Sequence, residues 1–373
     1  MRNALTGMFG IDSPLVGFNR SPGVVAEVTK AGGMGVLAAT GYTPEELDAQ
    51  LTWIEQQVGG RPFGVDVLVP SKTATGDPAD YIASLRAQIP DEHRRFVDEL
   101  LAKYDIPPVP DPELGSERFA ASVGPEIVEP LLDVAFSHRI SLMANALGPP
   151  PPGMLERGRR DGIPIAALVG TPEHAARQLD LGVDLLVAQG TEAGGHTGTI
   201  ATTVLVPEVV EAAGDVPVLA AGGIASGRQM AAALALGAAG VWCGSVWLSS
   251  HEDITSPAVK AKFLGATSSD TVRSPARTGK PARQLRSAWH DEWAGPASPG
   301  ALPMPLQPML VTEAWRRIDR AAEQGHAGAR ELESFFIGQV VGSFAQLRPA
   351  AEITREMIDD CREVLRGLGG LAD

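Results

Sequence analysis

Eight short apolar runs with the composition of β-strands recur along this chain, and helix-like segments separate them. The runs cover residues 13–18, 35–40, 63–68, 140–145, 164–169, 183–188, 216–221 and 239–244. Alternation of this kind is typical of parallel strands that are covered by helices. Eight such units in one chain predict an α/β fold of the (β/α)8 TIM-barrel type, which needs about 250 residues plus additions.

The helix boundaries in this pattern agree with capping chemistry. Thr43, Thr171 and Ser226 each place a hydroxyl group before a first helical turn, and proline and glutamate follow the two threonines. Glycines at 32–33 and at 182 end two of the predicted helices. These signals support repeated βα units.

The remaining residues predict a small, mostly helical cap built from insertions. We expect the following parts: barrel at 1–69, a helical and Pro-rich insertion at 70–120, barrel at 121–262, a cap region at 263–340, and a C-terminal helix packing on the barrel within 341–373. Closing helices are expected near 313–336 and 354–367.

Charge and cysteine content narrow the function. The chain has 31 Lys and Arg against 45 Asp and Glu, a net charge of −14 that disfavours binding to nucleic acid or to an anionic membrane. Its 2 cysteines and its residue spacing do not match a disulfide framework or a metal site. No segment resembles a secretion signal or a membrane span. We expect a cytoplasmic protein with a small-molecule substrate and no metal; a homodimer is one option for its oligomeric state.

Glycine pairs follow the seventh and eighth predicted strands. Gly222–Gly223 and Gly244–Ser245 lie on the two loops that commonly bind phosphate in barrels, where bare backbone N–H groups converge. Glycine lets the backbone approach an oxyanion, and Ser245 adds a hydroxyl donor. The alternative is that these glycines only make tight turns. Their placement on both loops favours a phosphate site.

The sixth loop, AQGTEAGGHTG at 188–198, carries the candidate catalytic residue. Gln189 leaves the strand, and Gly194–Gly195 present His196 with little steric cover. A histidine with a pKa near about 6.5 suits acid–base or hydrogen-bonding work at neutral pH. The alternative is a histidine hydrogen-bonded in the wall of the loop, and the position at the barrel mouth favours function.

Together, the segments at 188–198, 216–245 and 274–289 resemble the nitronate monooxygenase family, and residues 24–51 are similar to it too. The resemblance implies an FMN-containing barrel that oxidises nitronates with dioxygen to a carbonyl compound and nitrite. It implies that His196 is catalytic. The implied FMN contacts are Gly222, Gly223, Gly244 and Ser245 for the phosphate, Gln189, Gly194 and Gly195 for the ring or ribityl chain, and Gly17, Phe18 and Asn145 for the isoalloxazine.

One predicted cofactor contact departs from the family pattern. Many members carry asparagine after the third strand, where this chain has Asp66. A carboxylate beside a reduced flavin would disfavour the anionic form of that flavin. The N-terminal loop also lacks the methionine-containing stretch of better-known members.

Two questions stay open at this stage. A protonated or hydrogen-bonding His196 would stabilise a nitronate, whereas a neutral His196 could remove the α-proton of a nitroalkane. Two other functions compete with nitronate oxidation. One is an NAD(P)H-dependent FMN reductase acting on a quinone or an enoyl thioester, and the other is a flavin-free barrel that binds a sugar phosphate.

Other conspicuous residues have a structural interpretation. The basic residues of the cap loop are Arg277, Lys280, Arg283 and Arg286. They could clamp an anionic substrate or a pyridine nucleotide, or pin that loop to an acidic barrel, and we favour the second interpretation. Trp289 and Trp293, four residues apart, predict one packing face of a cap helix. Cys243 and Cys361 are expected to be small buried hydrophobes.

Overall fold

Eight parallel strands close into a barrel, as the sequence predicts. The computed structural model describes residues 1–69, 78–108, 125–146 and 148–370. The barrel strands, in order, are β1 (Leu15–Asn19), β2 (Met34–Ala38), β3 (Gly64–Asp66), β4 (Leu142–Asn145), β5 (Ile165–Val169), β6 (Leu185–Gln189), β8 (Val218–Ala221) and β9 (Gly240–Cys243). The ring closes where β9 pairs with β1, with Trp242 opposite Val16. Each strand overlaps one of the eight apolar runs.

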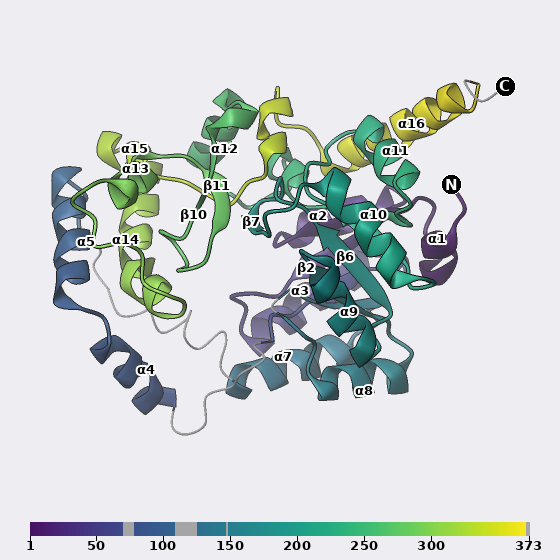
Figure 1. Cartoon of the computed structure of the whole chain (residues 1–373), viewed down its shortest axis with the longest axis horizontal. Coiled ribbons are helices and arrows are strands. Elements are labelled where there is room, and N and C mark those ends of the chain that lie inside the picture. The colour runs from purple at the N-terminus through teal and green to yellow at the C-terminus, as the bar shows by residue number, and fades with distance from the viewer. Residues whose placement is uncertain (70–77, 109–124, 147, 371–373) are drawn as a thin grey trace.

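Helices surround this barrel (Figure 1). They are α1 (Ala4–Phe9), α2 (Pro22–Lys30), α3 (Pro44–Val58), α7 (Pro125–Ser137), α8 (Pro152–Asp161), α9 (Pro172–Leu181), α10 (Thr202–Ala213), α11 (Gly227–Ala235) and α16 (Ala350–Gly369). The predicted caps at Thr43, Thr171 and Ser226 are confirmed, because each side chain accepts a backbone N–H from the first turn of its helix. The long α16 packs on α11 and α2.

Alternation along the strands divides the core into two layers. Val16, Val36 and Leu142 belong to the cluster inside the barrel, whereas neighbours such as Val65 belong to the layer between strands and helices. Because successive side chains of a strand point to opposite faces, Asp66 faces the barrel interior. Its register partners, Ala38 on β2 and Ala144 on β4, are small and apolar.

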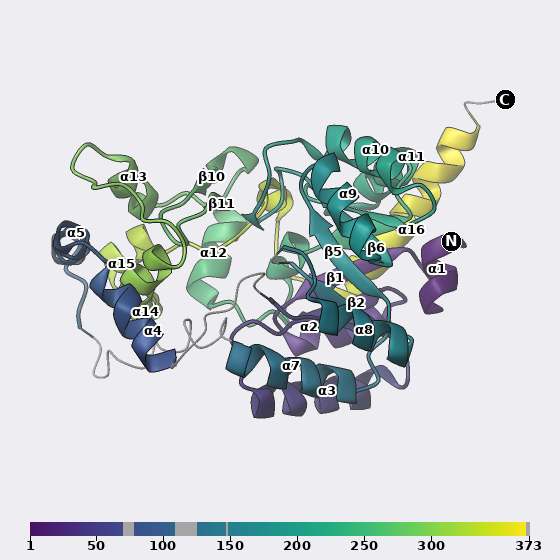
Figure 2. The ribbon, with the colours of Figure 1, turned by 60° about the horizontal axis from the view of Figure 1, so that its bottom comes forward.

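A second, smaller lobe lies beside the barrel (Figures 1 and 2). We use this name for α4 (Pro78–Ala87), α5 (Asp91–Lys103), α13 (Ala288–Ala294), α14 (Leu306–Glu323), α15 (Ala327–Leu332), β10 (Thr271–Ser274) and β11 (Ala282–Leu285). Trp289 and Trp293 are buried in its core with Trp315, which confirms the predicted packing face. The stretch near 313–336, where helical structure is expected, holds parts of two helices: Gly325 has a left-handed backbone, so α14 ends before it and α15 starts after it.

Barrel and second lobe meet through a three-stranded antiparallel sheet that the sequence did not predict. Its order is β10–β11–β7, and β7 (Gly195–His196) is part of the barrel's sixth loop. An apolar cluster fills the same junction with residues from η1 (Ser245–Ser249), α12 (Pro257–Gly265), β11 and η3 (Gln339–Ser343). The short η2 (Ser268–Asp270) precedes β10.

The division of the chain into parts at 70, 121, 263 and 341 stays a prediction, and much of 70–120 lies outside the described residues. Across the ranges that the structure describes, no helix combines the length and the apolar character that a bilayer crossing requires.

Candidate active site

The loops after β6, β8 and β9 meet at one end of the barrel, and a strap formed by residues 337–339 crosses them. The backbone N–H of Gln339 donates to the Glu192 carbonyl at 2.9 Å, and that of Gly338 donates to Ser245 Oγ at 2.8 Å. A Cβ atom on Gly194 would lie 2.8 Å from the carbonyl carbon of Ile337, so only glycine fits beneath the strap. The structure therefore brings the predicted residues Gly194 and Ser245 together.

The β8 and β9 loops form a cradle that fits an oxyanion. Gly222 and Gly223 have φ angles of +99° and +72°, which favour glycine. In the described part of the chain, the backbone N–H groups of Gly223 and Ile224 make no hydrogen bond. Ser245 starts η1, where the first N–H groups lack intrahelical partners. Free backbone N–H groups at loop and helix ends are the groups that bind phosphate in proteins.

Glu192 was not predicted as a site residue, and the structure gives it a structural role. Its carboxylate oxygens accept from the backbone N–H of Thr202 at 3.1 and 3.0 Å and from Thr202 Oγ1 at 2.8 Å. Thr202 begins α10, so the carboxylate satisfies an orphan donor at that helix N-terminus. Glu192 thereby ties the sixth loop to α10.

His196 lies on β7, directly opposite Ala282 of β11, and it is partly exposed. The ring Nε2 is 2.8 Å from Thr278 Oγ1. The surrounding protein, by limiting hydration of the ring, lowers the pKa of His196, and the Lys280 ammonium lowers it further. The imidazole is therefore held in its neutral form at neutral pH.

Asp66 is buried inside the mouth of the barrel, with 1% of its surface exposed, and its Oδ1 has no hydrogen-bond partner among the residues that the structure describes. Burial raises the pKa of this carboxyl group to about 7, and a hydrogen bond from the Ala146 backbone opposes the rise. A buried polar atom without a partner is unusual in folded proteins and is a candidate contact for a bound group.

The other predicted cofactor contacts have distinct surroundings. Phe18 faces the barrel interior and stacks on Trp242, with ring centroids 5.5 Å apart. A Cβ on Gly17 would lie 2.9 Å from Val28, so close packing against α2 explains that glycine. Gly244 lies beside Phe18, because a Cβ atom on Gly244 would be 3.8 Å from the Phe18 ring.

The side-chain amides of Asn145 and Gln189, at the mouth of the barrel, have different surroundings. Asn145 Oδ1 accepts from the Val69 backbone at 3.1 Å, and its Nδ2 donates to the Gly148 carbonyl at 3.3 Å, so it braces the loops after β3 and β4. Gln189, half-buried at the end of β6, has no side-chain partner within the described chain. The predicted contacts of all these residues with a flavin stay predictions.

Of the four basic cap-loop residues, Arg283 ties the loop to the barrel as interpreted from the sequence, whereas Arg277 and Arg286 make their contacts on the side of the second lobe. Arg277 stacks over Trp315 at 4.0 Å and donates to the Ser334 carbonyl at 2.9 Å. Arg283 Nε donates to the Thr191 carbonyl at 2.8 Å, and Arg286 pairs with Asp291 at 2.8 Å. Lys280 is exposed, and no side-chain partner for it exists among the described residues.

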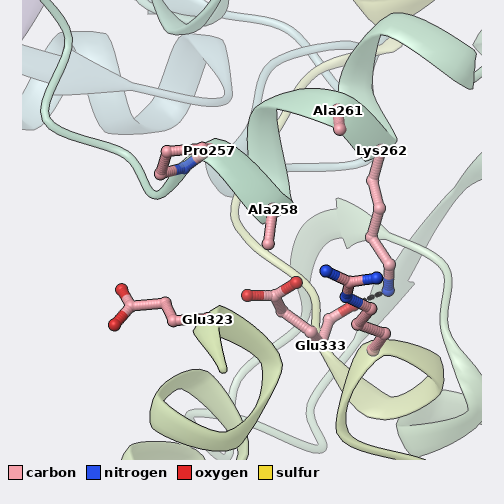
Figure 3. Close-up of a pocket in the computed structure, with 7 residues that line it drawn as sticks. Pro257, Ala258, Ala261, Lys262, Glu323 and Glu333 are labelled. Carbon is pink, nitrogen blue, oxygen red and sulfur yellow. Dashed lines mark hydrogen bonds between the residues drawn. The ribbon is translucent and has the colours of Figure 1, made fainter. Parts of the chain in front are cut away.

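A separate cavity of about 710 Å³ opens between α12, α14 and α15. Figure 3 shows Glu323 and Glu333 on one side of it and Ala258 and Lys262 on the other. Glu333 is buried, neither of its carboxylate oxygens has a hydrogen-bond partner in the described ranges, and burial raises its pKa to about 7. The cavity shares no lining residue with the three barrel loops.

The two cysteines are both buried, which confirms their expected packing role. Burial raises the pKa of the Cys243 thiol far above its ordinary value. Within the described ranges, no group of three or more His, Cys, Asp or Glu side chains is arranged to hold a metal ion.

Comparison with known proteins identifies the family of this chain. A sequence model of nitronate monooxygenases matches residues 2–360. The chain belongs to the nitronate monooxygenase family. The family indicates an oxidoreductase.

Individual proteins that are similar to this nitronate monooxygenase family member are oxidoreductases by name. A protein from Mycobacterium tuberculosis, provisionally named a monooxygenase, is 53% identical over 372 residues, which cover 100% of this chain and 99% of the relative. A Rhodococcus jostii dehydrogenase named for an octahydro-indene carboxyl-CoA is 30% identical over 77% of this chain and 66% of its own length. The solved structure of nitroalkane oxidase from Streptomyces ansochromogenes is similar over 98% of this chain and 100% of that chain, at 27% identity and a TM-score of 0.78.

The sequence missed Thr278, Glu192 and the strap. Thr278 lies 82 residues from His196, and no local pattern links a threonine in a turn to a distant histidine. The strap contacts the loops through backbone atoms, so its side chains carry no signal of the contact.

Proposed function

We propose that this protein is an FMN-dependent enzyme that oxidises alkyl nitronates with dioxygen to a carbonyl compound and nitrite. The observation that carries the proposal is the position of His196. It lies on the sixth barrel loop, next to two loops with free phosphate-binding donors, in a chain of the nitronate monooxygenase family. Its partners are a small nitronate and dioxygen, and a cytoplasmic location remains our expectation.

The residues present fit FMN. The N–H groups of Gly223, Ile224 and Ser245 would hold the phosphate, with Gly222 and Gly244 giving the backbone room to approach it. Phe18, Asp66 and Gln189 would contact the ring at the barrel mouth, and Gly195, Gly17 and Asn145 would shape the surrounding backbone. When bound, FMN supplies the redox chemistry, and the protein supplies position and charge.

The charge near His196 suits an anionic substrate. Lys280 is exposed, acts on the pKa of His196, and is unpaired within the described chain. Its ammonium group would attract the negatively charged oxygens of a nitronate toward the loop. A neutral His196 beside it keeps one ring nitrogen able to accept a proton, which extends the substrate class to neutral nitroalkanes.

A spectroscopic experiment tests the proposal directly. The purified protein, reconstituted with FMN, is mixed anaerobically with propyl-2-nitronate and separately with NADH or NADPH. We expect the flavin absorbance to bleach with the nitronate and not with the nicotinamides, and nitrite to form once air is admitted. Failure to bind FMN, or bleaching without nitrite, would contradict the proposal.

A second candidate is a flavin-dependent oxidoreductase that acts on a thioester. The named substrate of the Rhodococcus relative is a carboxyl-CoA, and that relative is 30% identical to this chain. Bleaching by NAD(P)H, followed by reoxidation with an enoyl-CoA such as crotonyl-CoA, would identify this function. A protein that purifies colourless and does not take up FMN would instead favour the flavin-free sugar-phosphate barrel.

A further inference from the structure

The imidazole of His196 is connected to the second lobe by one hydrogen bond. Its Nε2 lies 2.8 Å from the hydroxyl oxygen of Thr278, whose side chain is buried with 8% of its surface exposed. Thr278 belongs to the turn between β10 and β11, and the pairing of Ala282 with His196 holds that turn beside the ring. The contact is therefore built by the sheet that joins the two parts of the molecule.

The direction of this hydrogen bond follows from the other partners of Thr278. Its Oγ1 is 3.0 Å from the Lys280 carbonyl oxygen, and a carbonyl oxygen can only accept. The hydroxyl proton is therefore donated to Lys280, and the Oγ1 lone pairs are left to accept. One lone pair receives the Lys280 N–H at 3.4 Å, and the other faces His196 Nε2.

This arrangement requires a proton on Nε2 of His196. If the hydroxyl donated to Nε2 instead, the oxygens of Thr278 and Lys280 would face each other 3.0 Å apart with no proton between them. In neutral imidazole one nitrogen carries the proton and the other accepts. Nδ1, which has no partner within the described chain, is therefore the nitrogen with the free lone pair.

We propose that Thr278 is a positioning residue that fixes His196 in the Nε2–H tautomer and leaves Nδ1 as its proton acceptor. The inference rests on the proposed function and deepens it. With a neutral nitroalkane, the C–H bond breaks and its proton moves to Nδ1. The C–H electron pair passes into the nitro group to form the nitronate, and the resulting imidazolium keeps its Nε2–H bond to Thr278.

Charged groups around the ring are compatible with this role. Lys280 lies in the same turn, Arg283 is opposite Gly195 on β11, and Arg273 on β10 donates to the Thr197 carbonyl. Of these, Lys280 acts on the pKa of His196, in the direction that keeps the ring neutral. A neutral ring is the form in which the choice of tautomer matters.

The test reads the tautomer without any substrate. Protein labelled with 15N-histidine gives long-range 1H–15N correlations that distinguish Nε2–H from Nδ1–H, and His196→Gln identifies the signal of His196. We expect the Nε2–H pattern in the wild type and in Thr278→Ser, which keeps the hydroxyl. Thr278→Val and Thr278→Ala should lose this preference. An unchanged pattern in both of these variants, or loss of the pattern in Thr278→Ser, would overturn the proposal.

Kinetics supply the second readout. Thr278→Val should lower kcat for a nitroalkane by about tenfold or more, the scale of general acid–base effects, and leave kcat for the nitronate within about twofold. Thr278→Ser should restore the nitroalkane rate, and equal losses on both substrates would overturn the positioning role. If neither substrate reacts but the tautomer pattern responds as stated, the proposed function fails while the role of Thr278 is supported.

Discussion

At the scale of single residues, Asp66 combines a buried carboxyl group with an oxygen that has no partner in the described part of the chain. Its register neighbours, Ala38 and Ala144, are apolar, and no charged group of the described chain contributes to its pKa. A ring bound over it would remove remaining water, which favours the neutral acid. A neutral Asp66 can donate a hydrogen bond, as the amide of an asparagine does.

We therefore predict that FMN binding to this protein takes up a proton at Asp66. The bound state keeps the proton and the pKa of the free carboxyl is about 7, so the Kd for FMN should rise above that pH, by up to about tenfold per pH unit. Quenching of flavin fluorescence between pH 6 and pH 9 measures it. Asp66→Asn should bind FMN with no such dependence. Tighter binding at high pH, or the same profile in the variant, would contradict this protonation.

A second residue-scale prediction concerns Lys280. Its ammonium group lowers the pKa of His196, so Lys280→Met should raise that pKa and move the acid limb of kcat/KM for a nitroalkane to higher pH. The variant should also raise KM for a nitronate, because the nearby positive charge is lost. Arg286→Met, in the same segment but paired with Asp291, is the matched control and should leave both measurements unchanged.

Local signals decide which of these residues the sequence could identify. The Gly222–Gly223 pair follows a strand-like run directly and His196 lies on the loop after another, so their position at the barrel mouth could be predicted from neighbours in the chain. The hydrogen bond between Thr278 and His196 spans 82 residues, and it exists because β7 pairs with β11. Strand β7 has two residues and β11 has four, so neither is long enough to show an apolar periodicity in the sequence.

At the scale of elements, the same contrast holds. The barrel strands are four- or five-residue apolar runs, apart from the three-residue β3, and they could be read from composition. The sheet of the junction is built from TVRS, ARQL and GH, which mix charged and small residues. Its strands are specified by tertiary packing, and their assignment needed the structure.

The strap over the barrel loops gives a third prediction. A Cβ on Gly338 would lie 2.6 Å from the Glu192 carbonyl oxygen and 3.1 Å from Ser245 Oγ, so Gly338→Ala must displace the strap. We expect a loss of about 1–3 kcal/mol in the free energy of unfolding, as for other overpacked sites, and weaker FMN binding. Thermal unfolding and flavin titration measure both.

The control for this variant is Gly7→Ala in α1. A Cβ at Gly7 meets nothing within 4 Å, and alanine favours a helix over glycine. Gly7→Ala should therefore keep or raise stability. A Gly338→Ala protein as stable as wild type, with the same affinity for FMN, would show that the strap is not held as described.

The buried carboxyl group of Glu333, just after α15, gives a fourth prediction. Burial, Asp319 and Glu323 raise its pKa to about 7, while Lys262 and Arg330 oppose the rise. The folded state holds this proton more tightly than the unfolded state, so stability falls as the pH rises from about 4.5, the ordinary pKa, through 7. Glu333→Gln should remove that fall, which makes the variant more stable than wild type by about 2 kcal/mol at pH 8.5.

Chemical denaturation at pH 5 and pH 8.5 checks this result. The two proteins should be equally stable at pH 5, where Glu333 is protonated in the folded wild type. A variant that is less stable at both pH values would mean that the carboxylate has a partner that stabilises its charge.

At the scale of the whole molecule, the catalytic candidate lies on the bridge between the barrel and the second lobe. His196 belongs to the barrel through the β6 loop and to the junction sheet through β11. Arg283 and Arg273 reinforce that bridge by donating to the carbonyls of Thr191 and Thr197. The position of the His196 imidazole therefore depends on how the second lobe docks, whereas the phosphate cradle is formed by barrel loops and the strap that crosses them.

This difference predicts how the molecule responds when FMN is removed. FMN that binds the folded barrel and not the unfolded chain adds about 2.7 kcal/mol of stability at a free concentration one hundred times its Kd. The apoprotein should therefore melt several degrees lower. In hydrogen exchange, FMN should protect the backbone at 188–198, 221–226 and 244–246, and through β7 it should also protect β11. Helices α13 and α14 pack around Trp289 and Trp315, away from those loops, and should exchange at the same rate with and without FMN. Protection of α13 and α14 without protection of the barrel loops would place the cofactor in the second lobe and contradict the assigned cradle.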